Sequence, residues 1–457
     1  MTHMKKKISA FIILFLFLAV PLFAEELPEL PKGPLNLTQM IPEQFSAEYW
    51  IHRLPHANDV LKTPEELKTF NEEILAVIPE RKDIFKLKDT LRGKDIRDVV
   101  GQAYDTVAGR ILYDAKGVRI PKSFFETEVK PLIQLDAVSS KVNIRWGAAV
   151  RPASVRALPT HVKMLEEVGD IEFDQLQFTL IKLWTPVAIY HESKDGLWYY
   201  VQAPYVRGWV QSKDIAVFPS EQALKEKVKS KSFLVVTAES AWVCADAACK
   251  SKLQKPTMGT ILPLVDKTDN TYVVAMLSRK ESGNVFIRDG HVKKKSDVRE
   301  DFPPFTQASV IRQAFKLLGA RYGWGGMYNG RDCSGFTHDV FLSMGVDMPR
   351  DSKQQAFIGT QLGSFEPYKG AKEKAAILDQ LATPGITLLK MPHHMMLYIG
   401  EIDGNFYVIH STWAERISMT SDEKRRINQV VVTDLSLNGH SYLGGLFERI
   451  VQINEVN

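Results

Sequence analysis

The spacing of apolar residues changes along this chain, and those changes limit the folds that it can adopt. Up to about residue 125, apolar side chains repeat at helical spacing, as Leu67, Phe70 and Ile74 do. Between about residues 140 and 300 they instead form short runs broken by turn residues, which is typical of small β-barrels. Because 457 residues are too many for one compact unit, we predict a multidomain α+β fold.

The first 24 residues have the pattern of a secretory signal peptide. Lys5, Lys6 and Lys7 precede an apolar run at residues 8–23, and the small residue Ala24 follows. An uncleaved membrane anchor is the alternative, but the run is shorter than the about 20 residues that cross a bilayer. We therefore expect an exported protein, periplasmic, secreted or associated with the cell wall, that is not stably inserted in a membrane after cleavage.

The charge balance argues against a nucleic-acid partner. The chain has 58 Lys and Arg residues against 54 Asp and Glu residues, a formal charge of +4, and removing the three signal-peptide lysines lowers it to +1. No basic helix stands out, and no second apolar segment is long enough to span a bilayer.

Three cysteines occur, and thiols of exported proteins tend to be paired. Cys244 and Cys249 either close a small disulfide loop or remain two free thiols, because the sequence does not supply the geometry. Cys333 is left over in both cases. An odd thiol in an oxidising compartment is a candidate reactive group.

Cys333 stands at the start of a predicted helix, after a glycine-rich loop that can approach a bound ligand closely. Asp332 has the side chain of an N-cap, and Phe336, Val340 and Phe341 supply a buried helix face. In the first turn, unpaired amides and the helix dipole favour the thiolate, so we expect a lowered pKa and a nucleophilic role. A buried, inert cysteine is the alternative.

A nucleophilic cysteine needs a base, and histidines lie in two predicted strands downstream. A hairpin loop at residues 400–404 would set His394 directly opposite His410 on one face, with Cβ atoms about 5 Å apart. A tighter turn at residues 403–404 would instead pair His394 with Trp413 and put the two histidines on opposite faces. The functional interpretation predicts the wider loop.

Cysteine and histidine side chains also suit zinc. Cys333, His394, His410 and Asp332 could in principle share a metal ion, but the sequence has no close ligand pair such as CxxC or HExxH. We therefore expect neither a metal nor another cofactor. Ser334 is a poor alternative nucleophile because the GxSxG motif is absent.

The first β-rich region contains predicted hairpin turns at residues 194–196 and at Arg207-Gly208. Its aromatic residues either floor a substrate groove or form the core, as aromatic residues in strands mostly do. These residues are Trp198, Tyr199, Tyr200, Tyr205 and Trp209.

Several motifs together resemble one enzyme family. YGWGG is followed by DCSGF, then by PRDSKQQA, HMMLYIG and VIHS. This series resembles the NlpC-type cell-wall cysteine peptidases, which have a papain-like α+β domain. The preceding region is similar to the subgroup with an N-terminal helical clamp and two bacterial SH3-like β-barrels: HRLPHANDVLKTPEELKTFNEEI resembles the clamp, and RPASVRALPT with YVRGWVQSKDIAVF resembles the first barrel.

The resemblance implies a division of the chain into five segments. They are a signal peptide at 1–24, a helical clamp at 25–125, a first SH3-like domain at 126–220, a second at 228–300, and a papain-like catalytic domain at 305–457.

The resemblance also implies roles for single residues. Cys333 is the expected nucleophile, His394 the general base and then acid, and His410 the residue that orients His394. Tyr322 is expected to stabilise the oxyanion beside the backbone amide of Cys333. The expected substrate contacts are Asp332, Ser334, Arg350, Asp351 and Ser352. We add Tyr205, one of the aromatic residues of the first β-rich region. Asp351 and Ser352 would also suit an ordinary turn.

Members of this family cut peptidoglycan stem peptides between γ-D-glutamate and the diamino acid. The resemblance therefore implies a monomeric cysteine endopeptidase for such peptides. The clamp-bearing subgroup favours stems with a free N-terminal L-alanine, whose ammonium group Asp332 or Asp351 would suit, and this implies detached stems in wall turnover or recycling. Two alternatives remain: a wall-binding protein with an inert catalytic domain, and an acyl transferase or amidase on the same fold.

Overall fold

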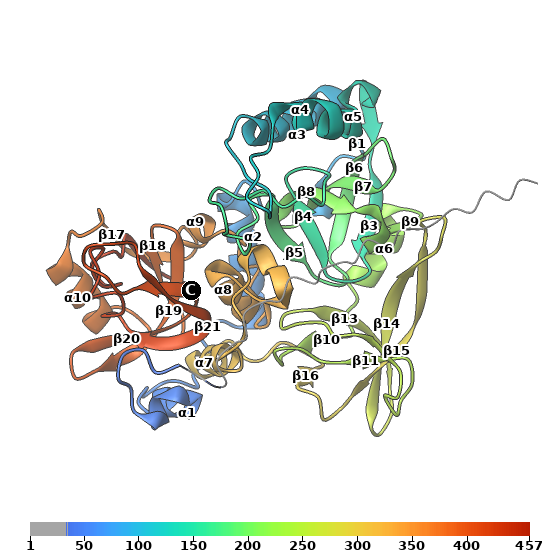
Figure 1. The fold of residues 1–457 in the computed structure, drawn as a ribbon. Coiled ribbons are helices and arrows are strands. Elements are labelled where there is room, and N and C mark those ends of the chain that lie inside the picture. Colours follow the sequence, from blue (N-terminus) through green and yellow to red (C-terminus); the bar gives the residue numbers. More distant parts are fainter. Residues whose placement is uncertain (1–32, 34) are drawn as a thin grey trace, which may run out of the picture.

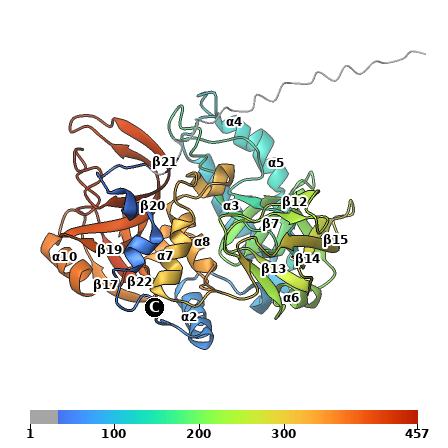
Figure 2. The same ribbon diagram turned by 90° about the horizontal axis from the view of Figure 1, so that it is seen from below.

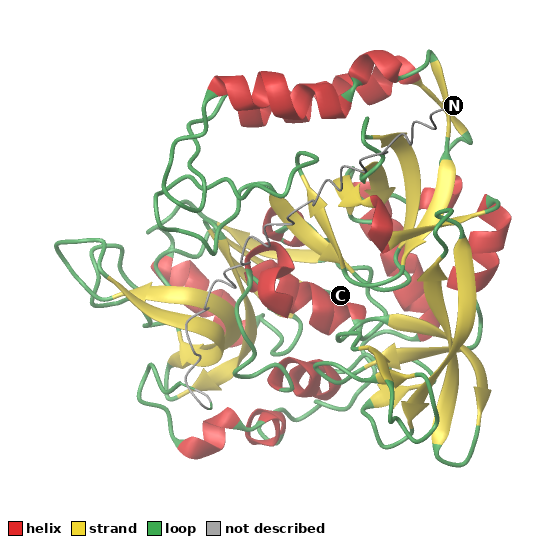
Figure 3. Cartoon of the chain, turned by 45° about the vertical axis from the view of Figure 1, so that its right-hand side comes forward, coloured by secondary structure: helices red, strands yellow, loops and turns green. Residues whose placement is uncertain are grey.

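The computed structural model describes residues 33 and 35–457, so the predicted signal peptide lies outside the described residues. Strands gather in separate groups, with helices between and around them (Figure 3). The structure confirms the predicted multidomain α+β class. In the described part of the chain, no helix has the length and apolar character needed to cross a membrane.

The N-terminal region is mostly helical, as its apolar spacing predicts, and its second helix begins with a capping box. Thr63 Oγ1 accepts the backbone amide of Glu66 at 3.3 Å, and the Glu66 carboxylate accepts the amide of Thr63 at 2.7 Å, which is a capping box. The elements of this region are α1 (Ala47–Ile51), α2 (Pro64–Val77), β1 (Thr90–Arg92), α3 (Gly93–Ala108), α4 (Lys122–Phe124), a π-helical turn (Phe125–Val129), α5 (Lys130–Ile133) and β2 (Lys141–Asn143), with 3-10 turns at Pro42–Phe45, Ile84–Lys86 and Leu135–Ala137.

These helices pack on two different cores. Trp50 of α1 and Phe70 of α2 join the apolar core of the C-terminal region, whereas Val100 of α3 joins the core of the first β-rich region. Arg312 of α7 (Gln307–Phe315) also donates from Nε to Glu48 of α1 at 2.7 Å. The N-terminal region therefore contacts both the first β-rich region and the C-terminal region.

The first sheet is antiparallel, with strand order β5-β4-β8-β7-β6-β3-β9. Its strands are β3 (Arg145–Ala149), β4 (Ala153–Arg156), β5 (Gln177–Ile181), β6 (Pro186–Glu192), β7 (Trp198–Ala203), β8 (Val206–Gln211) and β9 (Ile215–Phe218), with a 3-10 turn at Ser212–Asp214 before β9. Helix α6 (Glu221–Val228) follows it.

One turn predicted in the first sheet was wrong. Arg207 and Gly208 lie inside β8, and the turn falls at residues 204–205, because β7 and β8 pair as far as Ala203 and Val206. Gly208 instead allows close packing, since a Cβ there would come within 2.7 Å of Arg156 O. For the aromatic residues the core alternative holds at four positions, since these side chains are buried: Trp198, Tyr199, Tyr200 and Trp209.

The second sheet has the order β12-β11-β15-β14-β13-β10-β16. Cys244 and Cys249 form a disulfide, so the paired alternative holds for these cysteines. The strands are β10 (Phe233–Val236), β11 (Val243–Cys244), β12 (Lys252–Gln254), β13 (Ile261–Lys267), β14 (Thr271–Arg279), β15 (Val285–Lys293) and β16 (Val298–Arg299).

The third sheet belongs to the C-terminal region and has the order β17-β22-β18-β19-β20-β21. Helices α7 and α8 pack on one face of it and α10 on the other. Figures 1 and 2 show α8 between this sheet and the two preceding sheets. The further elements are a 3-10 segment (Trp324–Asn329), α8 (Cys333–Leu342), α9 (Ser352–Gln355), β17 (Thr360–Ser364), α10 (Ala371–Gln380), β18 (Thr387–Met391), β19 (His394–Ile402), β20 (Asn405–Arg416), β21 (Lys424–Asp434) and β22 (Gln452–Glu455).

The hairpin between β19 and β20 differs from the predicted wide loop. Ile402 pairs with Asn405 around a tight turn in which Asp403 and Gly404 both have positive φ, 51° and 79°. A bulge between Tyr398 and residue 400 then shifts the pairing by one residue. Such a shift moves the start of β19 to the other face, so the tight turn and a shared histidine face occur together.

Candidate active site

The predicted nucleophile stands at the start of α8. Asp332 caps this helix, because its Oδ1 accepts the backbone amide of Gly335 at 2.7 Å. Its Oδ2 accepts the amide of Gly325 at 2.8 Å, so one carboxylate fixes both the helix and the preceding loop. Cys333 is the first helical residue, and its partly exposed side chain packs beside the core shared by α8 and the third sheet.

The glycine-rich loop approaches the first sheet closely. Gly325 and Gly326 have positive φ values of 54° and 81°, and a Cβ on Gly325 would lie 2.7 Å from Gln177 Cγ. Gln177 Nε2 donates to Gly325 O at 2.9 Å. The expected close approach of this loop is therefore made to β5 of the first sheet, and it holds the two regions together.

The electrostatic environment of Cys333 differs from the prediction. Burial, followed by the Asp332 carboxylate, raises the pKa of the Cys333 thiol to about 11. The backbone amides of Met395 and Ser334 and the guanidinium of Arg350 act in the opposite direction but do not offset this rise. The expected lowered pKa is therefore wrong, because burial of the thiol, and after it the negative charge of the capping residue Asp332, outweigh the helix dipole.

This pKa predicts how Cys333 reacts with iodoacetamide. The thiolate is the reacting form, so the alkylation rate should rise about tenfold per pH unit between pH 7 and pH 9. Stopped reactions analysed by intact mass would give this rate, and the disulfide between Cys244 and Cys249 leaves Cys333 as the reporter. A rate that is already constant below pH 7 would contradict the raised pKa and indicate a thiolate paired with an imidazolium.

The two predicted histidines contact each other. His394 Nε2 lies 2.8 Å from His410 Nδ1, and His410 Nε2 lies 3.2 Å from Thr433 Oγ1 on β21. Met395, whose amide acts on the Cys333 sulfur, directly follows His394. The structure therefore joins the histidines by a hydrogen bond and places the Cys333 sulfur beside the start of β19. No hydrogen bond links the sulfur to His394 in the described chain.

Both imidazoles are neutral near pH 7. Burial lowers the pKa of His410 to about 3, and burial followed by the charges of His410, Arg449 and Lys390 lowers the pKa of His394 well below its ordinary value. Each ring then carries one N–H. If His394 donates from Nε2 to His410, and His410 donates from Nε2 to Thr433, Nδ1 of His394 keeps the lone pair of a base.

The sequence analysis missed Thr433. It lies on β21, two residues from Val431, which pairs with His410, and its side chain is fully buried. The sequence signal was small: one hydroxyl group after a run of valines in VVVTD. The pairing of β20 with β21 is what brings this hydroxyl to the histidine.

Tyr322 is buried close to Cys333. Its backbone amide donates to Asn428 O at 2.9 Å, which fixes the start of the glycine-rich loop against β21. Burial, followed by the charges of Asp332 and Cys333, raises the pKa of its phenol well above the ordinary value. The phenol therefore keeps its proton and is available as a hydrogen-bond donor.

Glu172, in the loop before β5, was also missed. Its buried carboxylate reaches from the first β-rich region to the C-terminal region and accepts hydrogen bonds from side chains there. These partners are Arg321 Nη2 at 3.1 Å, Asn428 Nδ2 at 3.0 Å, Trp413 Nε1 at 2.9 Å and Arg426 Nη1. Glu172 therefore fixes the first β-rich region against β20 and β21.

Three of the predicted substrate contacts form an internal network. Arg350 donates to Asp332 Oδ2 at 2.6 Å, to Ser334 Oγ at 3.0 Å and to Thr179 Oγ1 of β5 at 2.8 Å. Asp332 and Ser334 are buried, and the carboxylate of Asp332 is already occupied by two amides and this guanidinium. In this structure the three residues position α8 against the first sheet.

Asp351 and Ser352 lie at the start of α9. Asp351 caps this short helix through the amide of Lys353 at 2.7 Å and is exposed, whereas Ser352 is half-buried. Their interpretation as structural turn residues is thus correct for Asp351, and their contact with substrate stays a prediction.

Tyr205 faces the side of α8 away from its N-terminal cysteine. Its ring centroid lies 4.9 Å from that of His338, and its hydroxyl is buried. A substrate contact for Tyr205 also stays a prediction, since this position is occupied by packing between the first sheet and α8.

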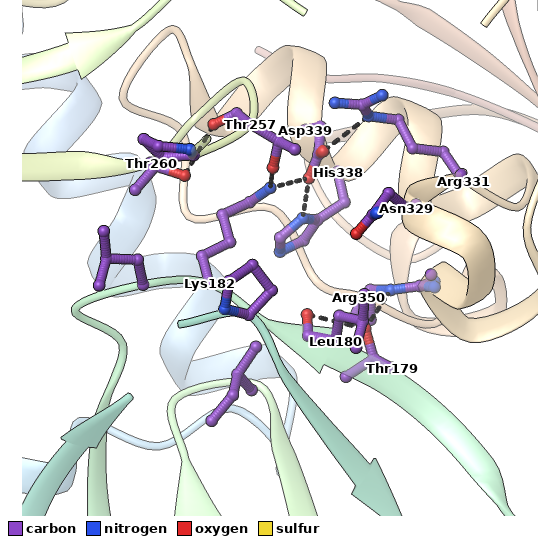
Figure 4. Close-up of a pocket in the computed structure, with 17 residues that line it drawn as sticks. Thr179, Leu180, Lys182, Thr257, Thr260, Asn329, Arg331, His338, Asp339 and Arg350 are labelled. Atoms are coloured by element: carbon purple, nitrogen blue, oxygen red, sulfur yellow. Dashed lines mark hydrogen bonds and ion pairs between the residues drawn. The ribbon is translucent and has the colours of Figure 1, made fainter. Parts of the chain in front are cut away.

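A cluster of charged side chains lies where α8 meets the first β-rich region, next to the second (Figure 4). The Asp339 carboxylate contacts Lys182 Nζ at 2.8 Å, Arg331 Nε at 2.8 Å and His338 Nδ1 at 3.2 Å. The cluster borders a cavity of about 60 Å³ that Thr257 of the second β-rich region also lines. No group of three His, Cys, Asp or Glu side chains in residues 33 and 35–457 is placed to hold a metal ion.

Two family models match the chain. One is described as an SH3 domain of the SH3b1 type and matches residues 163–211, within the first β-rich region. The other is the NlpC/P60 family, and it matches residues 319–435, which include the loop before α8 and strands β18 to β21. The C-terminal region of this chain is an NlpC/P60 domain. The resemblance to NlpC-type peptidases is thereby confirmed.

The chain is also similar in sequence to two Bacillus peptidases. The gamma-D-glutamyl-L-lysine dipeptidyl-peptidase of Bacillus cereus is 29% identical over 210 residues, which cover 46% of this chain and 57% of the relative. The protein of the same name from Bacillus subtilis is 32% identical over 101 residues, 22% of this chain and 31% of the relative. The matched residues thus span less than two thirds of either relative.

A solved structure shows the same overall fold. It was described as a novel NlpC/P60 endopeptidase from Photobacterium damselae subsp. piscicida, and it matches with a TM-score of 0.70 and 16% identity. The match covers 93% of this chain and 98% of that one, so the likeness extends beyond the NlpC/P60 domain to the N-terminal helices and the SH3-like sheets.

Proposed function

We propose that this protein is a cysteine endopeptidase that hydrolyses the bond between γ-D-glutamate and the diamino acid of peptidoglycan stem peptides. One observation carries the proposal: Cys333 begins α8 beside the amide of Met395, next to the hydrogen-bonded pair of His394 and His410, within an NlpC/P60 domain. The names of the two Bacillus relatives supply the substrate class.

The mechanism starts from neutral groups. As Cys333 Sγ attacks the γ-glutamyl carbonyl, its proton moves to Nδ1 of His394, which the contact with His410 leaves available. The Tyr322 phenol, kept protonated by its raised pKa, and the backbone amide of Cys333 stabilise the tetrahedral oxyanion. His394 then gives the proton to the leaving amine, and a thioester on Cys333 remains.

Water completes the cycle. His394 accepts a proton from water as the hydroxide attacks the thioester, and the returning proton regenerates the Cys333 thiol while the γ-carboxyl of the glutamate is released. An acyl transferase would use the same thioester but an amine in place of this water.

In this proposal, the Asp351 carboxylate binds the free N-terminal ammonium group of the substrate. Both Asp332 and Asp351 were expected to suit the ammonium, but Asp332 is occupied by Arg350 and two backbone amides. Asp351 is exposed and makes one capping hydrogen bond through Oδ1. The preference for detached stems follows from this recognition, and it fits an exported, monomeric enzyme of wall turnover or recycling.

The histidine chain predicts a positioning role for Thr433. Thr433→Val keeps the shape but removes the acceptor of the His410 N–H, so kcat/KM should fall about tenfold, and Thr433→Ser should restore most of it. Steady-state kinetics across pH 5 to 9 would check this, with a change in the pH profile as the sign of an altered imidazole. Equal kinetics for the wild type and Thr433→Val would contradict the proton arrangement.

Digestion of two peptides followed by mass spectrometry tests the proposed function. L-Ala-γ-D-Glu-diaminopimelate should give L-Ala-D-Glu and free diaminopimelate, and the same peptide with an acetylated N-terminus should be cut far more slowly. Cleavage at another bond, or of neither peptide, would contradict the proposal. Products joined to an added amine instead of water would indicate acyl transfer.

A further inference from the structure

A buried lysine stands on the same strand pair as the predicted base. Lys390 lies on β18 directly opposite Met395 of β19, and its side chain is 7% exposed. Leu388 and Met395 on this face pack in the core that α8 shares with the third sheet. Because side chains alternate along a strand, Lys390 points to the same side as these two residues, toward the start of α8.

This lysine forms no close ion pair within the described chain, and Asp351 acts on it only from a longer distance. Its ammonium donates to the backbone carbonyl of Met391, and within the described chain no carboxylate lies within ion-pairing distance of it. The positive charge nevertheless interacts with both Cys333 and His394. A buried charge without a partner of opposite sign is costly to the fold, so Lys390 is poorly explained by stability alone.

Groups of both signs act on the charge of Lys390. Burial lowers the pKa of the Lys390 ammonium, while the nearby groups Cys333 and Asp351 raise it and Lys353 lowers it. The Cys333 sulfur is a neutral thiol in the resting protein because its pKa is raised to about 11. A ligand carboxylate arriving beside Lys390 would supply the missing negative charge and raise the pKa of the ammonium again.

We propose that Lys390 binds a substrate carboxylate adjacent to the scissile bond and thereby sets substrate specificity. This inference rests on the proposed function, because a γ-D-glutamyl bond is flanked by such groups. One is the α-carboxylate of the D-glutamate on the acyl side. The other is a carboxylate of the diamino acid on the leaving side. Both have the chemistry that a buried ammonium recognises, and peptides in which each is converted to a carboxamide separate them.

Binding measurements test the inference without requiring turnover. On a Cys333→Ala background, calorimetry would compare L-Ala-γ-D-Glu-diaminopimelate with two analogues, one amidated at the glutamate α-carboxyl and one amidated at the carboxyls of the diamino acid. One analogue should bind about 10- to 100-fold more weakly than the parent peptide. Adding Lys390→Met should weaken the parent by the same factor and leave that analogue unchanged, and Lys390→Arg should keep part of the preference.

Equal selectivity with lysine or methionine at position 390 would overturn the inference, as would the absence of any preference for the carboxylate peptides. The Cys333→Ala background separates recognition from a direct effect on the thiol. Lys390 has an electrostatic contact with Cys333 in the wild type, but no thiol is present in the binding measurements, so a loss of selectivity in Lys390→Met there reports contact with the substrate. The position of the cut by the wild type tests the proposed function separately, so either statement can fail alone.

Discussion

Cys333→Ala is expected to abolish peptide hydrolysis, lowering kcat by at least about 10⁴-fold. The thiol is the group that forms the acyl intermediate in the proposed mechanism, and no second free cysteine exists to replace it, since Cys244 and Cys249 are paired. The side chain is partly exposed, so its loss should change the thermal unfolding midpoint little. Kinetics and thermal unfolding of the variant would check both parts.

The matched control for Cys333→Ala is Ser334→Ala, which changes the neighbouring hydroxyl but keeps the thiol. Its effect on turnover should be far smaller, although Ser334 accepts a hydrogen bond from Arg350 and some loss is expected. Hydrolysis that persists in Cys333→Ala, or that is lost equally in both variants, would contradict the assignment of the nucleophile.

Asp339→Ala is expected to lower the free energy of unfolding by about 3 to 5 kcal/mol. The carboxylate is buried between Lys182 and Arg331, each at 2.8 Å; Arg331 is itself buried, and the Lys182 side chain is only 12% exposed. Removing Asp339 leaves two positive charges behind α8 without compensation. Urea denaturation would measure the change, with Asp98→Ala on the exposed face of α3 as a control that should stay within about 0.5 kcal/mol.

The same aspartate predicts a dependence on pH. Its neighbouring cations, Lys182 first, hold the pKa of Asp339 well below its ordinary value despite the opposing effect of burial. A group whose pKa is lowered by folding stabilises the protein above its unfolded pKa, near 4, and loses that contribution as the pH falls. The stability difference between the wild type and Asp339→Ala should therefore shrink below about pH 4. A difference that is small at pH 7 would contradict the account of the charge cluster.

Local features of this chain could be predicted from its sequence. The N-cap at Asp332 forms as expected, because it depends on a side chain and an amide three residues away. Helix α8 and the position of Cys333 at its start follow from the same local signals. The shared face of His394 and His410 was also expected.

Features that depend on distant contacts could not be predicted. The bulge near Tyr398 has no strong sequence signal, and it made the tight turn compatible with a shared histidine face. The raised pKa of Cys333 arises from the partial burial of its sulfur against the core and from Asp332, whereas the local argument considered only the helix dipole. Glu172, Thr433 and Lys390 each reach the site through strand pairing or contact between regions.

The most direct test of the account is reaction with a label that resembles the substrate. L-alanyl-D-glutamate whose γ-carboxyl is converted to a diazomethyl ketone presents the acyl half of the proposed substrate to the thiol. Peptide mapping by mass spectrometry should find one adduct, on Cys333, and addition of L-Ala-γ-D-Glu-diaminopimelate should prevent its formation. An adduct on another residue, or a protein that still cleaves the peptide while Cys333 remains unlabelled, would contradict the central claim that Cys333 attacks the γ-glutamyl carbonyl.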